Sequence, residues 1–307
     1  MKKLFIILCA ALCVLPAFAG NNEKVVDKSG KQPKWVYSSG KDYIVVSAEG
    51  ADIQTAKDKA MTQVRKQILS SIAESVQSSS AINTRELGVN GKYNVLEEYN
   101  NLVETKGALI PFLSEVSEAK VEEYYWEKIK RGKDYTYRYH IKYPFNQFDL
   151  MRMSDEFLTH EREINQKLDD FSKDNFTSYN SVEEMLQRVQ EVRLLRASLM
   201  EQDPRRATCQ NIEKVYNGYL KTIVIRLISI NKQQLVYAPY FGEKQLTTTI
   251  QPKLESNCLN DMQFVPQNGK CVVKYDYETS CYDGEQNDIT VTLNIGGNKV
   301  KNTFIVK

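Results

Sequence analysis

The sequence predicts an α+β protein: a strand–helix–hairpin domain, a helical hairpin or stalk, and a β-rich, sandwich-like C-terminal domain. Three patterns indicate this fold class. Apolar residues recur with helical spacing from about Asp52 to Ser78, and a strict period of two marks a hairpin that ends near Tyr143. Helical periodicity returns between Ser154 and about Leu220, and runs that are typical of strands fill the rest of the chain.

These patterns divide the chain into consecutive segments. A flexible leader is expected after the N-terminal signal sequence, because its residues are polar and include Gly and Pro. The predicted segments are a signal peptide at 1–19, the leader at 20–33, an α+β domain at 34–150, helices at 151–220 and a β-rich domain at 221–307.

The first 19 residues have the form of a secretory signal peptide. Lys2 and Lys3 precede an apolar run, and cleavage is expected after Ala19 because small residues stand there. The run is shorter than the roughly 20 apolar residues that a spanning helix needs, and no later segment could span a membrane. Cys13 follows Ala-Ala-Leu, which is the wrong order for lipid attachment. We therefore expect a mature chain in the periplasm or cell envelope, or secreted.

The charge balance of the mature chain is even. Removing the two lysines of the signal peptide from the 41 basic residues leaves 39, which equals the 39 acidic residues. Nucleic-acid binding needs a basic surface that displaces counterions, so no nucleic-acid partner is expected. A polybasic attraction to anionic lipid is excluded on the same ground.

The first domain is predicted from one strand and one long helix. The strand is the apolar run DYIVVSAEG, which ends at Gly50. The alanines at positions 56 and 60 would let the following helix lie close to a sheet. After this helix, residues 81–116 are expected to form a loop with short pieces of structure. The helix carries one apolar stripe, made of Ile53, Ala56, Ala60, Val64, Ile68, Ile72 and Val76.

The hairpin is the strongest strand signal in the chain. Residues 118–130 lead into the turn 131–134, and the chain returns as YTYRYHIKY. Because side chains alternate along a strand, Tyr135, Tyr137, Tyr139, Ile141 and Tyr143 share one face, and Thr136, Arg138, His140 and Lys142 share the other. We expect the tyrosine face to pack on the long helix and His140 to be solvated.

Three helices and then several strands are expected after the hairpin. Ser181 and Glu184 predict a capping box, and Pro204 is expected to separate the second helix from the third. The second helix should bury Val182, Met185, Val189, Val192, Arg196 and Leu199, and the third Cys209, Ile212, Tyr216 and Tyr219. The C-terminal strands are TIVIRLISI, QLVYA, CVVKYDYE, DITVTLNI and KVKNTFIV, with a small β-sandwich as the first expectation and an α+β domain as the second.

The mature chain retains four cysteines, which often pair in an oxidising compartment. Cys258, Cys271 and Cys281 crowd the C-terminal part, so one disulfide among them is expected. The alternative is that all four, Cys209 included, are small buried residues.

The order strand, helix, loop and hairpin resembles the LPP-twenty-like family of bacterial envelope lipoproteins. Matching positions are Pro33, Trp35, Val36, Gly50, Ala56, Ala60 and Val64, and the resemblance covers residues 33–150. It implies an envelope location and a noncatalytic role in surface or appendage-associated assemblies. The chain departs from the family in lacking the lipid-attachment motif, which leaves membrane tethering without support.

No motif for catalysis, a metal or a cofactor is present. The two histidines, His140 and His160, stand in no zinc-binding pattern, and no serine-hydrolase elbow or phosphate-binding loop occurs. Adjacent carboxylates such as Glu97-Glu98 are expected on solvated faces. Residues 283–288 could offer oxygen ligands to calcium but do not match an EF-hand, so an acidic turn is favoured.

Two noncatalytic functions are expected, with an enzyme as the third alternative. The first is an assembly or scaffold role through contact with an unidentified envelope protein, with an exposed apolar patch on the helical stalk. The second is binding of a glycan or peptidoglycan by the hairpin, because exposed rings can stack on sugars. The candidate binding residues for the second function are Tyr124, Trp126, Tyr135, Tyr137 and Tyr139.

Overall fold

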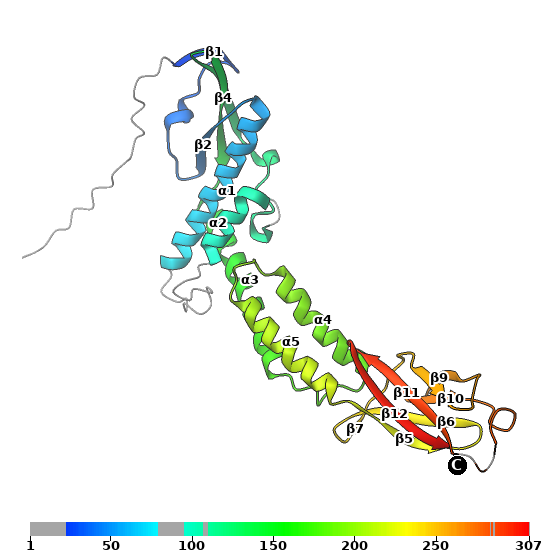
Figure 1. Cartoon of the computed structure of the whole chain (residues 1–307). Coiled ribbons are helices and arrows are strands. Elements are labelled where there is room, and N and C mark those ends of the chain that lie inside the picture. Colours follow the sequence, from blue (N-terminus) through cyan, green and yellow to red (C-terminus); the bar gives the residue numbers. More distant parts are fainter. Residues whose placement is uncertain (1–22, 79–94, 107–109, 283, 285, 307) are drawn as a thin grey trace, which may run out of the picture. The chain divides into compact units, whose positions relative to one another are not determined.

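The computed structural model describes residues 23–78, 95–106, 110–282, 284 and 286–306 (Figure 1). The chain forms two compact units. The first consists of Met1–Asn83 and Leu96–Leu158, and the second of Thr84–Val95 and Thr159–Lys307. The expected signal peptide lies outside the described residues. Among the helices that are described, none is both long and apolar enough to cross a membrane.

The first unit contains a four-stranded antiparallel sheet in the order β1-β3-β4-β2. The expected hairpin is confirmed, with Arg131 paired to Asp134 across a turn in which Gly132 has a φ of 63°. A positive φ strains any residue with a Cβ, which explains the glycine. The strands are β1 (Glu23–Lys28), β2 (Tyr43–Gly50), β3 (Glu123–Arg131) and β4 (Asp134–Pro144).

Part of the expected leader is an edge strand. Residues 23–28 form β1, which pairs antiparallel with β3 and has every residue exposed. The prediction of a flexible leader is therefore wrong for this stretch. A strand with no buried side chain has no alternating pattern to reveal it, and its pairing partner is about a hundred residues away in the sequence.

Helix α1 (Ile53–Ser78) covers part of this sheet through contacts with β2 and β4, as the apolar stripe predicts. Ala56 and Ala60 are fully buried. Asp52 caps the helix by accepting a hydrogen bond of 2.8 Å from the Thr55 backbone N–H. The helix starts very close to the strand end, because a Cβ at Gly50 would lie 2.4 Å from the Ala56 backbone nitrogen.

A second helix, α2 (Val95–Lys106), lies where a loop was expected. Its residue Tyr99 makes edge contacts with Phe112 and Phe157, at ring-centroid distances of 5.1 and 6.1 Å. Tertiary packing of this kind stabilises a short helix whose own periodicity is brief. Short 3-10 helices lie at Lys34–Tyr37 (η1), Pro111–Leu113 (η3) and Glu118–Lys120 (η4).

The predicted helices are α3 (Gln147–Lys173), α4 (Val182–Ser198) and α5 (Arg205–Lys221). Helix α3 is continuous and contributes residues to both units. The capping box is present, with Glu184 N–H donating to Ser181 Oγ at 3.1 Å. Arg196 was expected in the core of α4, but Leu195 is the buried residue there, and Arg196 donates to Glu213 instead.

The C-terminal part is strand-rich, as predicted, with two antiparallel sheets in the orders β5-β6-β10-β9 and β12-β11-β8. Two of the strands, β7 and β8, are short. The bounds are β5 (Val224–Ile230), β6 (Gln234–Phe241), β7 (Lys244–Gln245), β8 (Lys253–Ser256), β9 (Gln263–Gln267), β10 (Lys270–Lys274), β11 (Asn287–Ile295) and β12 (Asn298–Val306).

Helices α4 and α5 and the C-terminal strands share one hydrophobic core. Val182, Tyr216 and Val291 are all buried in it. Backbone hydrogen bonds join the start of α4 to the loop after β7, for example from Val182 N–H to Thr247 O at 3.0 Å. The expected boundary near residue 220 therefore falls inside the second unit, because neither the helices nor the strands bury their apolar faces separately.

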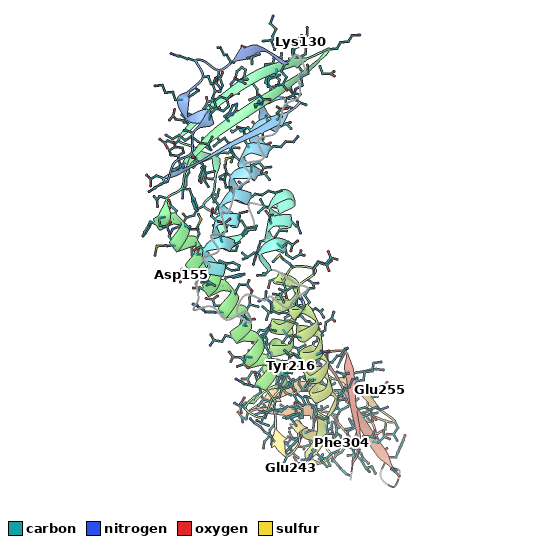
Figure 2. All side chains as sticks on the ribbon, turned by 90° about the vertical axis from the view of Figure 1, so that its left-hand side faces the viewer. Lys130, Asp155, Tyr216, Glu243, Glu255 and Phe304 are labelled. Atoms are coloured by element: carbon teal, nitrogen blue, oxygen red, sulfur yellow. A yellow bond between two sulfur atoms is a disulfide. The ribbon has the colours of Figure 1, made fainter. Side chains whose placement is uncertain are left out.

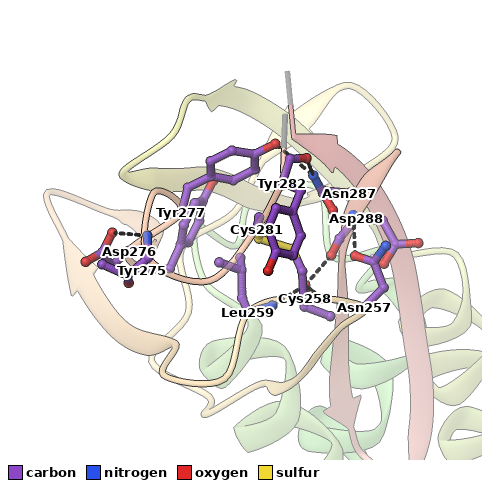
Figure 3. The surroundings of a disulfide bond; sticks show 12 residues. Asn257, Cys258, Leu259, Tyr275, Asp276, Tyr277, Cys281, Tyr282, Asn287 and Asp288 are labelled. Atoms are coloured by element: carbon purple, nitrogen blue, oxygen red, sulfur yellow. Dashed lines mark hydrogen bonds between the residues drawn. A yellow bond between two sulfur atoms is a disulfide. The ribbon is translucent and has the colours of Figure 1, made fainter. Parts of the chain in front are cut away.

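A disulfide joins Cys258 and Cys281, which confirms the expectation of one bridge among the C-terminal cysteines (Figure 3). Cys271, the third candidate, is buried with a free thiol, as is Cys209. Burial raises the pKa of the Cys271 thiol to about 11, so it stays protonated at neutral pH. These two cysteines follow the alternative reading of small buried residues.

Candidate functional site

The register of β3 and β4 gathers the predicted binding residues on one face of the sheet. Trp126 is the Cα partner of Tyr139, Lys128 of Tyr137, and Lys130 of Tyr135. Residues that stand opposite one another in an antiparallel pair point to the same side. We call the side chains of Tyr124, Trp126, Tyr135, Tyr137 and Tyr139 the aromatic face.

The rings of the aromatic face contact one another diagonally across the two strands. Tyr124 and Tyr139 stack with centroids 5.6 Å apart and an interplanar angle of 11°. Trp126 and Tyr137 are tilted, at 6.1 Å and 58°. Such contacts limit the ring orientations, so the face is a set of partly fixed flat surfaces.

Helix α1 covers only one end of this face. Tyr139, Ile141 and Tyr143 are buried, as expected for a face that packs on the helix. Tyr124 and Tyr135, in contrast, are 59% and 47% exposed. The expectation that the whole tyrosine face packs on α1 is therefore wrong for Tyr135. Trp126 and Tyr137 are half-buried.

A groove of about 610 Å³ lies where the aromatic face meets the start of α1. Tyr124, Trp126 and Tyr139 form part of its wall. Its polar lining includes Gln54 and the ion pair between Lys57 and Glu118. Such a mixture of flat rings and hydrogen-bonding groups is suited to an amphipathic ligand.

Burial makes Tyr139 harder to ionise. Desolvation raises the pKa of its hydroxyl to about 12, and the neighbouring Tyr124 and Glu118 act in the same direction. The hydroxyl is neutral at pH 7, as an ordinary tyrosine is, and can donate a hydrogen bond.

Two lysines that the sequence analysis did not single out extend the aromatic face towards the turn. Lys128 Nζ lies 4.9 Å from the ring centroid of Tyr135 and 5.4 Å from that of Tyr137. Lys130 Nζ lies 5.7 Å from the centroid of Tyr135, and Figure 2 shows Lys130 at the turn end of the hairpin. The period of two in EYYWEKIK could have shown that these lysines share a face with Tyr124 and Trp126.

The opposite face of the hairpin carries a compact network of charges. Glu49 accepts hydrogen bonds from Arg131 at 2.7 Å and from Arg138 at 2.7 Å. Glu23 of β1 pairs with the same two arginines, at 2.6 and 3.3 Å. The hydrogen bond from Arg131 is the largest cause of a lowered pKa of the Glu49 carboxyl. These acids and bases neutralise one another.

His140, expected to be solvated, is buried at 3% exposure on that opposite face. The ring of Tyr125 stacks on it at 5.7 Å, and Trp35 and Val36 of η1 pack against Tyr125. The prediction was wrong because side-chain alternation along β4 indicates which residues share a face. It does not indicate that a distant segment, here η1, covers that face. Desolvation lowers the pKa of His140 to about 4, so the imidazole is neutral at pH 7.

Ser47 and His140 form a hydrogen-bonded pair, with Oγ and Nδ1 2.6 Å apart. A pair of this kind could serve nucleophilic catalysis if the imidazole took the hydroxyl proton. A base with a pKa of about 4 is a weak proton acceptor at neutral pH, and His140 Nε2 makes no hydrogen bond within the described structure. The hydrogen bond joins β2 to β4, where Ser47 and His140 are Cα partners.

A buried ionic cluster in the second unit was also not anticipated from the sequence. Arg205 Nη1 contacts Glu161 at 2.8 Å, and its Nη2 contacts Asp203 at 2.6 Å. Burial is the largest cause of a raised pKa of the Glu161 carboxyl.

Among the described residues, no three His, Cys, Asp or Glu side chains gather as metal ligands would. The possible calcium loop at 283–288 lies partly outside the described residues.

No protein-family model, curated protein or solved structure matches this chain. The resemblance to the LPP-twenty-like family therefore stays a prediction, and the candidate site depends on its own geometry.

Proposed function

We propose that this chain is an exported, noncatalytic binding protein of the bacterial cell envelope, and that its aromatic face binds a glycan. The observation that carries the proposal is the exposure of Tyr124 beside a groove of about 610 Å³, with Trp126 half-buried in the same wall. Flat rings that remain open to solvent can stack on sugar rings, and Gln54, Lys57 and Glu118 can hydrogen-bond to hydroxyl groups.

Export is supported by two independent features. The signal-peptide pattern of residues 1–19 directs a chain out of the cytoplasm. The disulfide between Cys258 and Cys281 fits an oxidising compartment such as the periplasm. A noncatalytic role is supported by the weak basicity of His140 next to Ser47.

The test is binding of the mature chain, from Gly20, to purified peptidoglycan and to soluble polysaccharides. We expect Tyr124→Ala with Trp126→Ala to weaken binding about tenfold, since each aromatic contact contributes roughly 0.5–1.5 kcal/mol. Tyr37→Ala is the matched control, because Tyr37 is 83% exposed in the same unit but belongs to η1. Unchanged binding in the double variant, or equal weakening in the control, would contradict the proposal.

A second candidate function is contact with an envelope protein through the helices of the second unit. Leu194 is 60% exposed and lines a groove of about 390 Å³ together with Phe171 and Arg188. Such a groove can accept an apolar side chain from a partner. We expect crosslinking from cell envelopes to recover a stoichiometric partner that Leu194→Asp abolishes and Val215→Asp, at a 50% exposed residue of α5, retains. Equal recovery with both variants would exclude this groove.

A further inference from the structure

We propose that the glycan bound by the aromatic face is acidic, and that Lys24, Lys128 and Lys130 bind its anionic groups. This inference rests on the proposed glycan-binding function and names the chemical class of the ligand: a polysaccharide that carries carboxylate groups.

The first support is that the lysines of β3 lie on the same face as the aromatic rings. Lys128 and Lys130 are two residues apart on β3, so their side chains leave the same face about 7 Å apart along the strand. They lie over the rings of Tyr135 and Tyr137. A ligand that stacks on these rings would therefore place its substituents within reach of both ammonium groups.

The lack of internal charge compensation is the second support. In the part of the chain that the structure describes, Lys128 and Lys130 form no ion pair with a carboxylate. Asp27, the Cα partner of Lys128, is the nearest acidic residue by register, and among the described residues it forms no ion pair with Lys128. Lys57 in the adjoining groove differs, because Glu118 neutralises it.

The third support is the pairing of β1 with β3. Lys24 stands directly opposite Lys130 in the ladder. Like charges directly opposite in an antiparallel pair destabilise a sheet. An anion bound between them would remove that repulsion, so the arrangement favours a ligand with negative groups over a neutral one.

Rings and lysines together distinguish an acidic polysaccharide from other anions. A lipid headgroup or a free phosphate would use the lysines alone and leave Trp126 and Tyr124 without a role. A single-stranded nucleic acid could use both, but the mature chain has equal numbers of acidic and basic residues. The half-exposed rings next to hydrogen-bonding groups fit sugar rings that carry carboxylates.

The experiment compares two forms of one polymer on the mature full-length chain: polygalacturonate, and the same polymer with its carboxylates reduced to alcohols. We expect the acidic form to bind at least tenfold more tightly at low salt. The preference should disappear in the variant Lys128→Glu with Lys130→Glu, while affinity for the neutral form stays unchanged. Trp126→Ala should weaken binding of both forms. The matched control is Lys299→Glu with Lys301→Glu, which makes the same charge change on exposed positions of β12.

The outcomes separate the two proposals. Equal binding of both polymers, or a control variant that loses the preference as well, overturns the acidic-ligand inference and leaves glycan binding standing. Binding of neither polymer, nor of peptidoglycan, contradicts the proposed function itself. Binding of a single-stranded oligonucleotide or of anionic lipid vesicles as tightly as polygalacturonate also overturns the inference, because the site would then recognise charge without the sugar.

Discussion

The two faces of the β3–β4 hairpin are formed by alternate residues of the same strands, but they differ in whether their charged side chains are paired. On one face Glu23 and Glu49 neutralise Arg131 and Arg138, and His140 is buried uncharged. On the other, Tyr124 and Tyr135 lie open to solvent, and Lys128 and Lys130 form no ion pair with any carboxylate that the structure describes. A single period of two thus encodes one face that neutralises its own charges and one that combines buried rings with exposed ones.

The largest expected effect on stability comes from the end of the aromatic face that α1 covers, and its open end should contribute much less. Tyr139→Ala should lower the free energy of unfolding by about 3–4 kcal/mol, because it removes a buried ring under α1. Tyr124→Ala should cost less than about 1 kcal/mol, since that ring is mostly exposed and loses one stacking contact. Urea unfolding of both variants measures this. Equal losses would mean that Tyr124 is also needed for stability and is a poor candidate for binding.

The next effect concerns the buried imidazole on the opposite face. His140 has a folded-state pKa of about 4 against 6.5 for the ordinary group, so the unfolded chain takes up a proton first as pH falls. The unfolded state then binds more protons, and stability is lost between about pH 6.5 and 4, on the order of 3 kcal/mol. Above pH 6.5 the group contributes no pH dependence.

His140→Gln isolates this contribution, because glutamine cannot titrate. The free energy of unfolding of the wild type minus that of the variant should decrease as pH falls from 7 to 4. Chemical unfolding at several pH values measures the difference. A constant difference would show that His140 is protonated with nearly the same affinity in both states, and hence that η1 does not exclude water from it.

The smallest effect is expected from the charge network. Glu49→Gln should cost about 1 kcal/mol at pH 7, because Glu49 is partly exposed and solvent screens its two arginine contacts. Its folded-state pKa is lowered, so this stabilisation is complete above the ordinary pKa of 4.5 and is lost as pH falls below it. The difference in stability between wild type and variant should therefore shrink as pH falls below 4.5. Glu115→Gln, in an exposed pair with Lys120, is the control and should change less.

Much of the fold follows from local patterns in the sequence. The stripe of α1, the hairpin turn at 131–134 and the capping box at Ser181 depend on residues that are close in the chain, and all three were predicted correctly. Strand β1 and helix α2 were missed because distant partners stabilise them: β3 in the first case, Phe112 and Phe157 in the second.

The candidate site was only half predictable for the same reason. The alternation of Tyr and Trp placed the rings on one face, but exposure of each ring depends on how far α1 reaches along the sheet. Similarly, His140 stands in a polar series and is buried only because Trp35 and Val36 fold over its neighbour Tyr125. Side-chain alternation determines which residues share a face, whereas coverage is a tertiary property.

The absence of a Cβ at Gly50 allows α1 to start against the end of β2. Gly50 is paired with Tyr137, and α1 turns back over the sheet immediately beyond it. A methyl group at position 50 would meet backbone atoms of Thr55 and Ala56 rather than a side chain that could rotate away. A residue with a Cβ there would force backbone atoms at the end of β2 or in the first turn of α1 to move. Because Tyr137 stands opposite Gly50 on β4, such a movement would occur beside the aromatic face.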